Sequence, residues 1–111
     1  MGAQDCSELI TISASDTEVL VNRSSSRTCL QCVDSNMMPD SNTIWILPDG
    51  GLLTDSSNPA PGLVELVDGV LVLLDPMQLL EDGDNAYQVD CHTGQTGFGY
   101  EDIDIYSSSK P

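Results

Sequence analysis

Four cysteines, Cys6, Cys29, Cys32 and Cys91, are the residues of this chain best suited to covalent or metal chemistry. Cys29 and Cys32 have Cys-x-x-Cys spacing, which zinc sites and thioredoxin-like redox sites both use. Cys6 and Cys91 form no second compact pair, and the residues after Cys32 have a turn composition rather than that of a helix start. An even cysteine count in a chain of 111 residues instead favours two disulfides and an oxidising compartment, with no metal and no cofactor.

The other reactive side chains form no catalytic pattern. The single histidine, His92, has outward parity on its expected strand, and the serines cluster in loops and tails at 24–26, 56–57 and 107–109. Calcium needs about six to eight converging oxygens. No EF-hand spacing connects the candidate ligands Asp82, Asp84, Asp90, Asp102 and Asp104. We therefore expect a protein without catalytic residues, in which the acidic side chains form a solvated face.

The charge balance excludes several classes of partner. Three Lys and Arg stand against 18 Asp and Glu, so the formal net charge is −15. Almost nothing can neutralise phosphates, which argues against nucleic acid and against an anionic membrane surface. No apolar run approaches the ~20 residues that a membrane span needs. The same charge favours a basic protein partner, although it also serves solubility.

Apolar residues alternate with a period of two over most of the chain, which indicates β-strands rather than helices. Turn signals such as Pro48-Asp49-Gly50, Asp68-Gly69 and Asp75-Pro76 separate the runs. The pattern predicts an all-β fold, an antiparallel sandwich or small barrel of about seven to nine short strands. The expected strands lie near residues 18–21, 28–32, 43–47, 51–53, 63–67, 70–74, 86–91 and 103–106, with one helical turn at 77–81.

An ordered set of residues then resembles an immunoglobulin-superfamily domain of the I-set or V-like type, over residues 16–106. Leu30-x-Cys32 resembles the strand with the family's first core cysteine, and Trp45, thirteen residues later, resembles its core tryptophan. Residues 68–73, Asp-Gly-Val-Leu-Val-Leu, are similar to the entry into a later core strand, and residues 81–91 look like the corner and strand before the second cysteine. The order of cysteine, tryptophan and cysteine carries most of this resemblance.

The resemblance implies an immunoglobulin-like antiparallel β-sandwich with Greek-key connections. Its core would contain Leu30, Trp45, Leu71, Leu73, Tyr87 and Val89. Cys32–Cys91 would join the sheets and Cys6–Cys29 would be the second disulfide; the alternative pairs Cys29 with Cys91 and Cys6 with Cys32. The chain departs from the family at Val89, where the usual corner tyrosine stands two residues before the second cysteine. Tyr87, four residues before Cys91, lies on the same face of an alternating strand.

The resemblance also implies the organisation of the chain and its compartment. Residues 1–15 would be an N-terminal tail or first strand, 16–106 the domain, and 107–111 a linker stub. Asn22-Arg23-Ser24 is an N-glycosylation sequon, which makes Asn22 a candidate glycosylation site. Disulfides and a sequon together predict an extracellular location, at the cell surface as a receptor ectodomain or in a secreted glycoprotein.

For such a domain we expect a recognition or adhesion module that binds another protein without chemistry. The partner could be a second copy, giving a homodimer, or a different protein with a basic surface. Candidate contact residues are Met37 and Met38 in one loop and Phe98 and Tyr100 in another; the alternative is that these side chains pack onto the sandwich ends. The alternative functions are a secreted immune-type or carbohydrate-recognising domain and a structural spacer.

Overall fold

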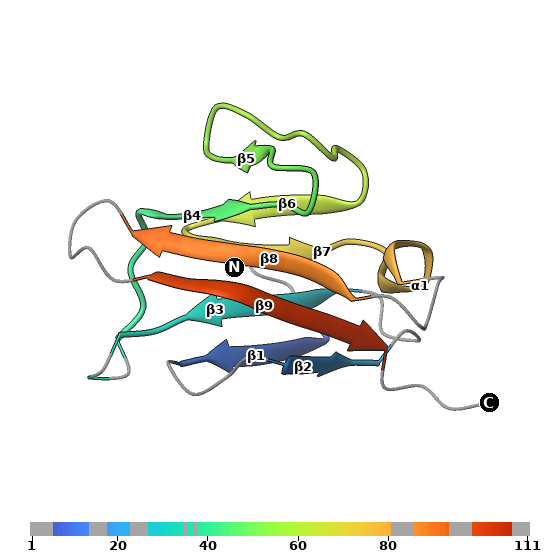
Figure 1. The fold of residues 1–111 in the computed structure, drawn as a ribbon, viewed down its shortest axis with the longest axis horizontal. Helices are drawn as coiled ribbons and strands as arrows, with labels where there is room; N and C mark the ends of the chain where they lie inside the picture. The colour runs from blue at the N-terminus through green and yellow to red at the C-terminus, as the bar shows by residue number, and fades with distance from the viewer. Residues whose placement is uncertain are drawn as a thin grey trace.

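The protein folds into two β-sheets around a common core, a β-sandwich-like all-β arrangement, in a computed structural model (Figure 1). The structure describes residues 6–13, 18–22, 27–34, 36, 38–80, 86–93 and 99–107. The candidate contact residues Met37 and Phe98 lie outside the described residues.

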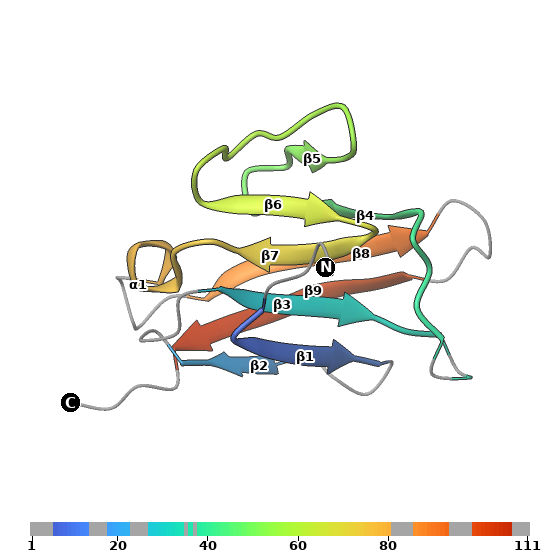
Figure 2. The same cartoon turned by 180° about the vertical axis from the view of Figure 1, so that it is seen from behind.

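One sheet has four strands in the order β1-β3-β7-β6. Figure 2, which is turned by 180° from Figure 1, shows this sheet in front. These strands are β1 (Glu8–Ile12), β3 (Thr28–Cys32), β7 (Val70–Leu73) and β6 (Val64–Val67). All four residues of β7 are buried, because its inner side faces the core and its outer side lies in a second small apolar cluster with Cys29 and Cys6. A continuous apolar run, Val-Leu-Val-Leu, is what a strand buried on both faces requires.

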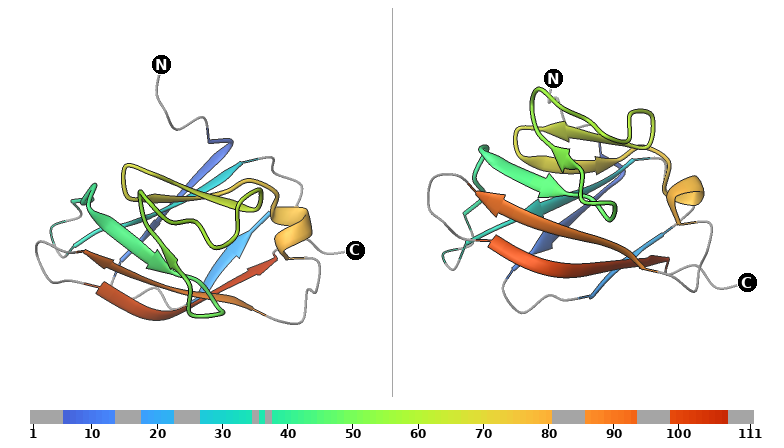
Figure 3. Two further views of the ribbon diagram at one scale, coloured as in Figure 1. Left: turned by 90° about the horizontal axis from the view of Figure 1, so that it is seen from above. Right: turned by 45° about the horizontal axis from the view of Figure 1, so that its top comes forward.

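The second sheet has five strands in the order β2-β9-β8-β4-β5. These strands are β2 (Glu18–Val21), β9 (Gly99–Ser107), β8 (Tyr87–Thr93), β4 (Thr43–Ile46) and β5 (Leu52–Leu53). Burial alternates along β2 and β4, so one side of this sheet faces the core and the other faces outward. The two layers are seen from other directions in Figure 3.

The expectation of antiparallel pairing throughout is wrong for the first two strands. β1 runs parallel to β3, and β2 runs parallel to β9. The beginnings of the first pair lie together, since Cys6 is bonded to Cys29 and the backbone N–H of Ser7 donates to the Arg27 carbonyl at 2.8 Å. Two strands that pair side by side from adjacent beginnings run in the same direction, so these links fit the parallel pairing of β1 with β3.

The core lies between the sheets and centres on Trp45, which is fully buried. Its indole Nε1–H donates to the Gly69 carbonyl at 3.0 Å, in the turn between β6 and β7. The predicted core residues Leu30, Leu71, Leu73 and Val89 are also buried in this cluster, and Tyr87 packs against it half-buried. The Cys32–Cys91 disulfide bridges β3 and β8, so it joins the two sheets within the core.

Short connections end the strands where turn residues occur. Asp68 and Gly69 both have positive φ, 51° and 81°, in the tight turn between β6 and β7. A Cβ at Gly69 would lie 2.5 Å from the Asp40 carbonyl oxygen, so this position needs glycine for space as well as for conformation. The expected helical turn at 77–81 is α1 (Pro76–Leu79), whose first turn is capped by the Asp75 side chain.

Candidate binding surface

The outward side of the five-stranded sheet carries a group of acidic side chains that the chain brings together from distant positions. Glu18 of β2 lies opposite Asp104 of β9, which in turn lies opposite Gln88 of β8. Asp90 follows two residues after Gln88 and therefore projects from the same side. With Asp102, these residues form what we call the acidic face: Glu18, Gln88, Asp90, Asp102 and Asp104.

A β-bulge shapes the middle of this face. Val89 pairs with Ile103 but Cys91 pairs with Tyr100, so β9 has one more residue than β8 between these pairs. Asp102 adopts a positive φ of 58° there, and its backbone N–H donates to Asp90 Oδ1 at 2.8 Å. The bulge places two acidic residues, Glu101 and Asp102, opposite Asp90.

Hydrogen bonds hold part of the acidic face, but no cation of the described chain lies on it. The Gln88 amide donates to Asp104 Oδ1 at 2.8 Å. Arg27 is the one Lys or Arg within the described ranges, and it pairs with Glu65 of the other sheet at 3.4 Å. The negative charge of the face is therefore balanced, within the described part of the chain, by no side chain of the protein itself.

Apolar side chains flank the acidic face on both sides. At the β2 edge, Leu20 is 62% exposed and lies opposite Tyr106. Toward the other edge, Ile46 of β4 pairs with Asp90 of β8 on one side and with Leu52 of β5 on the other; Leu52 is 48% exposed. In protein interfaces, buried apolar side chains act as anchors and a polar rim surrounds them. Partly exposed apolar residues beside charged ones have this composition.

The outer surface of the four-stranded sheet differs, because buried side chains lie on it. Cys29 lies on the outer side of β3, as its parity predicts, yet it is fully buried. The Cys6–Cys29 disulfide packs there against Val70 and Val72 of β7, and Val67 and Leu74 complete a second small apolar cluster. We call this surface the sealed face: Cys6, Cys29, Val67, Val70, Val72 and Leu74.

Two of the contact residues expected from the sequence, Met38 and Tyr100, differ in how exposed their side chains are. Met38 is 60% exposed, in a loop that the Asp34 carboxylate fixes by accepting the backbone N–H of Asn36 and of Met38. Tyr100 is half-buried against the core, and its hydroxyl donates to the Val33 carbonyl. The bulge explains the inward position, because one extra residue between Ile103 and Tyr100 turns Tyr100 to the inner side.

The other expected site residues are placed as follows. Asn22, directly after β2, is exposed. His92 lies on the outer side of β8 beside Gly99, where an added Cβ would come within 2.7 Å of the His92 ring. Both disulfides have the pairing that the family resemblance favoured, Cys6–Cys29 and Cys32–Cys91.

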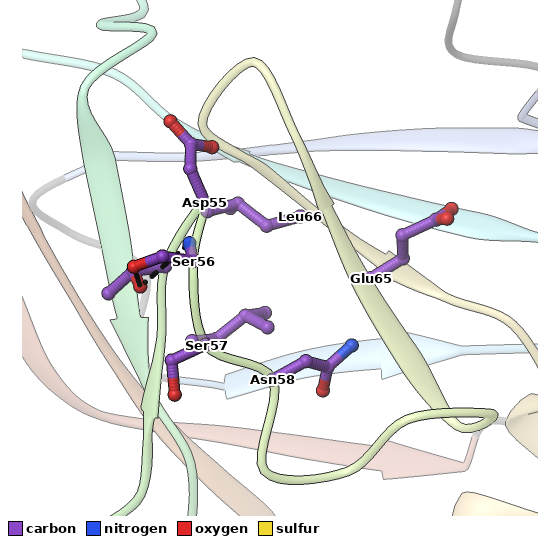
Figure 4. A pocket seen from close by; sticks show the side chains of 8 residues that line it. Asp55, Ser56, Ser57, Asn58, Glu65 and Leu66 are labelled. Carbon is purple, nitrogen blue, oxygen red and sulfur yellow. Dashed lines mark hydrogen bonds between the residues drawn. The ribbon is translucent and has the colours of Figure 1, made fainter.

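A polar cavity of about 350 Å³ opens between the loop after β5 and strand β6 (Figure 4). Its polar side chains serve the loop itself. The Asn58 amide donates to the Val64 carbonyl and accepts from the Ala60 N–H, both at 2.9 Å, and Thr54 Oγ1 accepts from the Ser56 N–H at 3.3 Å. The carboxyl groups of Asp55 and Glu65 do not point toward one another. This arrangement supports a structured loop better than a site that converges on a ligand.

A smaller apolar cavity of about 250 Å³ lies at one end of the sandwich, between Leu47, Leu63 and Tyr87. Burial, and to a lesser extent the nearby Asp49 carboxylate, raises the pKa of Tyr87 to about 12. The phenol therefore stays neutral over the physiological range and behaves as a packing residue at this end.

Within the described ranges, no group of three or more His, Cys, Asp and Glu side chains could hold a metal ion. The described residues include no helix with the length and apolarity that a bilayer crossing requires.

Comparison with known proteins gives no relative for this chain: no family model, no curated protein and no solved structure matches it.

Proposed function

We propose that this chain is an extracellular recognition or adhesion module with an immunoglobulin-type fold, which binds another protein without catalysis. The strand order β1-β3-β7-β6 in one sheet and β2-β9-β8-β4-β5 in the other supports the fold assignment. The Cys32–Cys91 disulfide within the same core cluster as Trp45 supports it further. Two disulfides fit an oxidising, extracellular compartment.

The observation that carries the binding proposal is the contrast between the outer surfaces of the two sheets. The sealed face has its own disulfide and buried valines, whereas the acidic face is open and flanked by Leu20 and Leu52. A rigid sheet that presents exposed charged and apolar side chains is a suitable scaffold for recognition. The fixed loop that exposes Met38 adds a second contact region at one end of the sandwich.

The test is a binding measurement with the disulfide-bonded domain in multivalent form. The domain carries a C-terminal biotin, is assembled on streptavidin, and is applied to panels of cells and immobilised ectodomains. We expect saturable binding that Ile46→Arg on the five-stranded sheet abolishes. The matched control Leu9→Arg, on the exposed edge of the other sheet, retains it. Circular dichroism checks that both variants are folded.

Absence of saturable binding to every surface would contradict the proposal and favour a spacer domain. Equal loss of binding in both variants would move the contact surface away from the five-stranded sheet. Inhibition by free sugars, without binding to deglycosylated targets, would replace protein recognition by carbohydrate recognition.

A further inference from the structure

We infer that the outward side of the five-stranded sheet binds a basic protein surface that also carries apolar side chains, and that it does not pair with a second copy of this chain. This inference rests on the proposed function, and it specifies the partner of the same surface.

The charge of the face determines the sign of the partner. Glu18, Asp104 and Asp90 come from three adjacent strands, and Glu18 and Asp104 are direct neighbours in register. Like charges placed directly opposite on neighbouring strands reduce stability. The described chain puts no cation beside them, because Arg27 is engaged with Glu65 on the other sheet. A partner with lysine or arginine side chains would supply the missing counter-charges and relieve this repulsion.

The apolar flanks determine what else the partner must carry. Leu20 with Tyr106 lies on one side of the acidic residues, and Ile46 with Leu52 lies on the other. Charge attraction at a solvated surface gives fast encounter but little affinity, whereas buried apolar anchors give affinity. A partner segment with basic side chains in the middle and apolar side chains at both ends matches this arrangement.

The same features disfavour a homodimer through this surface. Two copies meeting here would bring two sets of carboxylates together, and like-charge contacts across an interface oppose association. The whole chain adds to this repulsion, because its formal net charge is −15. Recognition through this surface is therefore heterophilic.

The experiment uses the disulfide-bonded domain and a fluorescent synthetic lysine–leucine peptide as the probe, with lysines in the middle and leucines at both ends, and binding is measured by anisotropy. The test variant is Asp90→Asn/Asp104→Asn, which keeps the shape of both side chains and removes two charges from the face. The control variant is Asp55→Asn/Asp68→Asn, which removes two charges elsewhere; asparagine tolerates the positive φ of position 68. A second probe, a lysine–serine peptide in which serine replaces each leucine, isolates the contribution of the apolar side chains.

We expect the test variant to weaken binding of the lysine–leucine peptide about tenfold and the control variant by about twofold or less. The lysine–serine peptide should bind more weakly than the lysine–leucine peptide, and Leu20→Ser should reduce that difference. Salt should weaken binding of both probes. Sedimentation equilibrium should show a monomer for the domain without peptide.

Equal weakening in the two variants would overturn the inference, since the peptide would then respond only to net charge. A homodimer that Asp90→Asn/Asp104→Asn strengthens would also overturn it. These outcomes are distinguishable from failure of the proposed function, which is an absence of saturable binding to any cell or ectodomain. Saturable binding to a partner that is insensitive to salt and to the test variant would retain the function and reject this partner chemistry.

Discussion

The outer surfaces of the four-stranded and five-stranded sheets differ in how far their side chains are buried. On the first, Val70 and Val72 are buried beneath the Cys6–Cys29 disulfide. On the second, Asp90 and Asp104 remain at the surface without a described basic partner. A disulfide and a layer of valines stabilise a fold, whereas neighbouring carboxylates reduce its stability. The difference shows that one surface contributes to stability, and it is the observation on which our proposal of a binding role for the other rests.

The largest expected effect is on the sealed face. Cys6→Ala/Cys29→Ala opens a cross-link between residues 23 apart and uncovers Val70 and Val72, so it should lower the free energy of unfolding by about 3 kcal/mol. Urea denaturation followed by tryptophan fluorescence measures it. The matched change on the other surface, Asp90→Asn/Asp104→Asn, should alter stability by only about 0.5 kcal/mol. An alanine variant as stable as the parent would remove the distinction between the surfaces.

A single side chain on each surface sharpens the comparison. Val72 and Leu20 both project outward, but Val72 is 0% exposed whereas Leu20 is largely exposed. Val72→Ala should therefore cost about 2 kcal/mol, and Leu20→Ala less than about 0.5 kcal/mol. Thermal unfolding by circular dichroism reads out both. Similar costs at the two positions would mean that Leu20 is buried in solution.

The four-stranded sheet also contains a position where stability can be gained. The Thr28 hydroxyl is fully buried and has no hydrogen-bond partner among the described residues. Thr28→Val replaces an unsatisfied hydroxyl with a methyl group of similar size, so it should raise the free energy of unfolding by about 1 kcal/mol. Urea denaturation of this variant beside Thr43→Val is the measurement, because the Thr43 hydroxyl donates to the Asp40 carbonyl at 2.7 Å. Destabilisation by both substitutions to the same extent would show that the Thr28 hydroxyl has a partner.

The smallest expected effect is on the acidic face. Asp104→Asn removes the repulsion with Glu18, and an asparagine oxygen can still accept from Gln88. Stability should rise by about 0.5 kcal/mol, and the gain should shrink as salt screens the charges. Asp55→Asn, in an exposed loop, is the control that should change little. A loss of stability on Asp104→Asn would mean that the carboxylate makes a favourable contact in the free domain.

Most strands and the core residues could be predicted from the sequence. The family resemblance placed Trp45 and Val89 inside, and the parity of Cys29 relative to Cys32 placed Cys29 on the outer side. The burial of Cys29 was not predictable in this way, because it depends on the disulfide to Cys6 and on valines from another strand. The parallel direction of β1 was not predictable from local patterns either, because it is a property of its pairing with β3, which is distant in the sequence.

The candidate binding surface was harder to predict than the fold. The sequence predicted that Asp90, Asp102 and Asp104 belong to a solvated acidic face. Their proximity to Glu18 depends on the register between β2 and β9, which the sequence does not show. Tyr100 shows the limit of parity arguments, since one bulged residue reverses the side that it faces. The signal for Leu20 was present in the Glu-Val-Leu-Val pattern of residues 18–21, where an apolar residue occupies an outward position.

The most direct test of the central claim is amide NMR of the isotope-labelled domain during titration with the lysine–leucine peptide. The account predicts saturable shifts in outward-facing residues of β2, β8 and β9 and near Ile46, with little change around Val72. Shifts concentrated on the sealed face, or spread evenly over the molecule, would contradict the division between a stabilising surface and a binding surface.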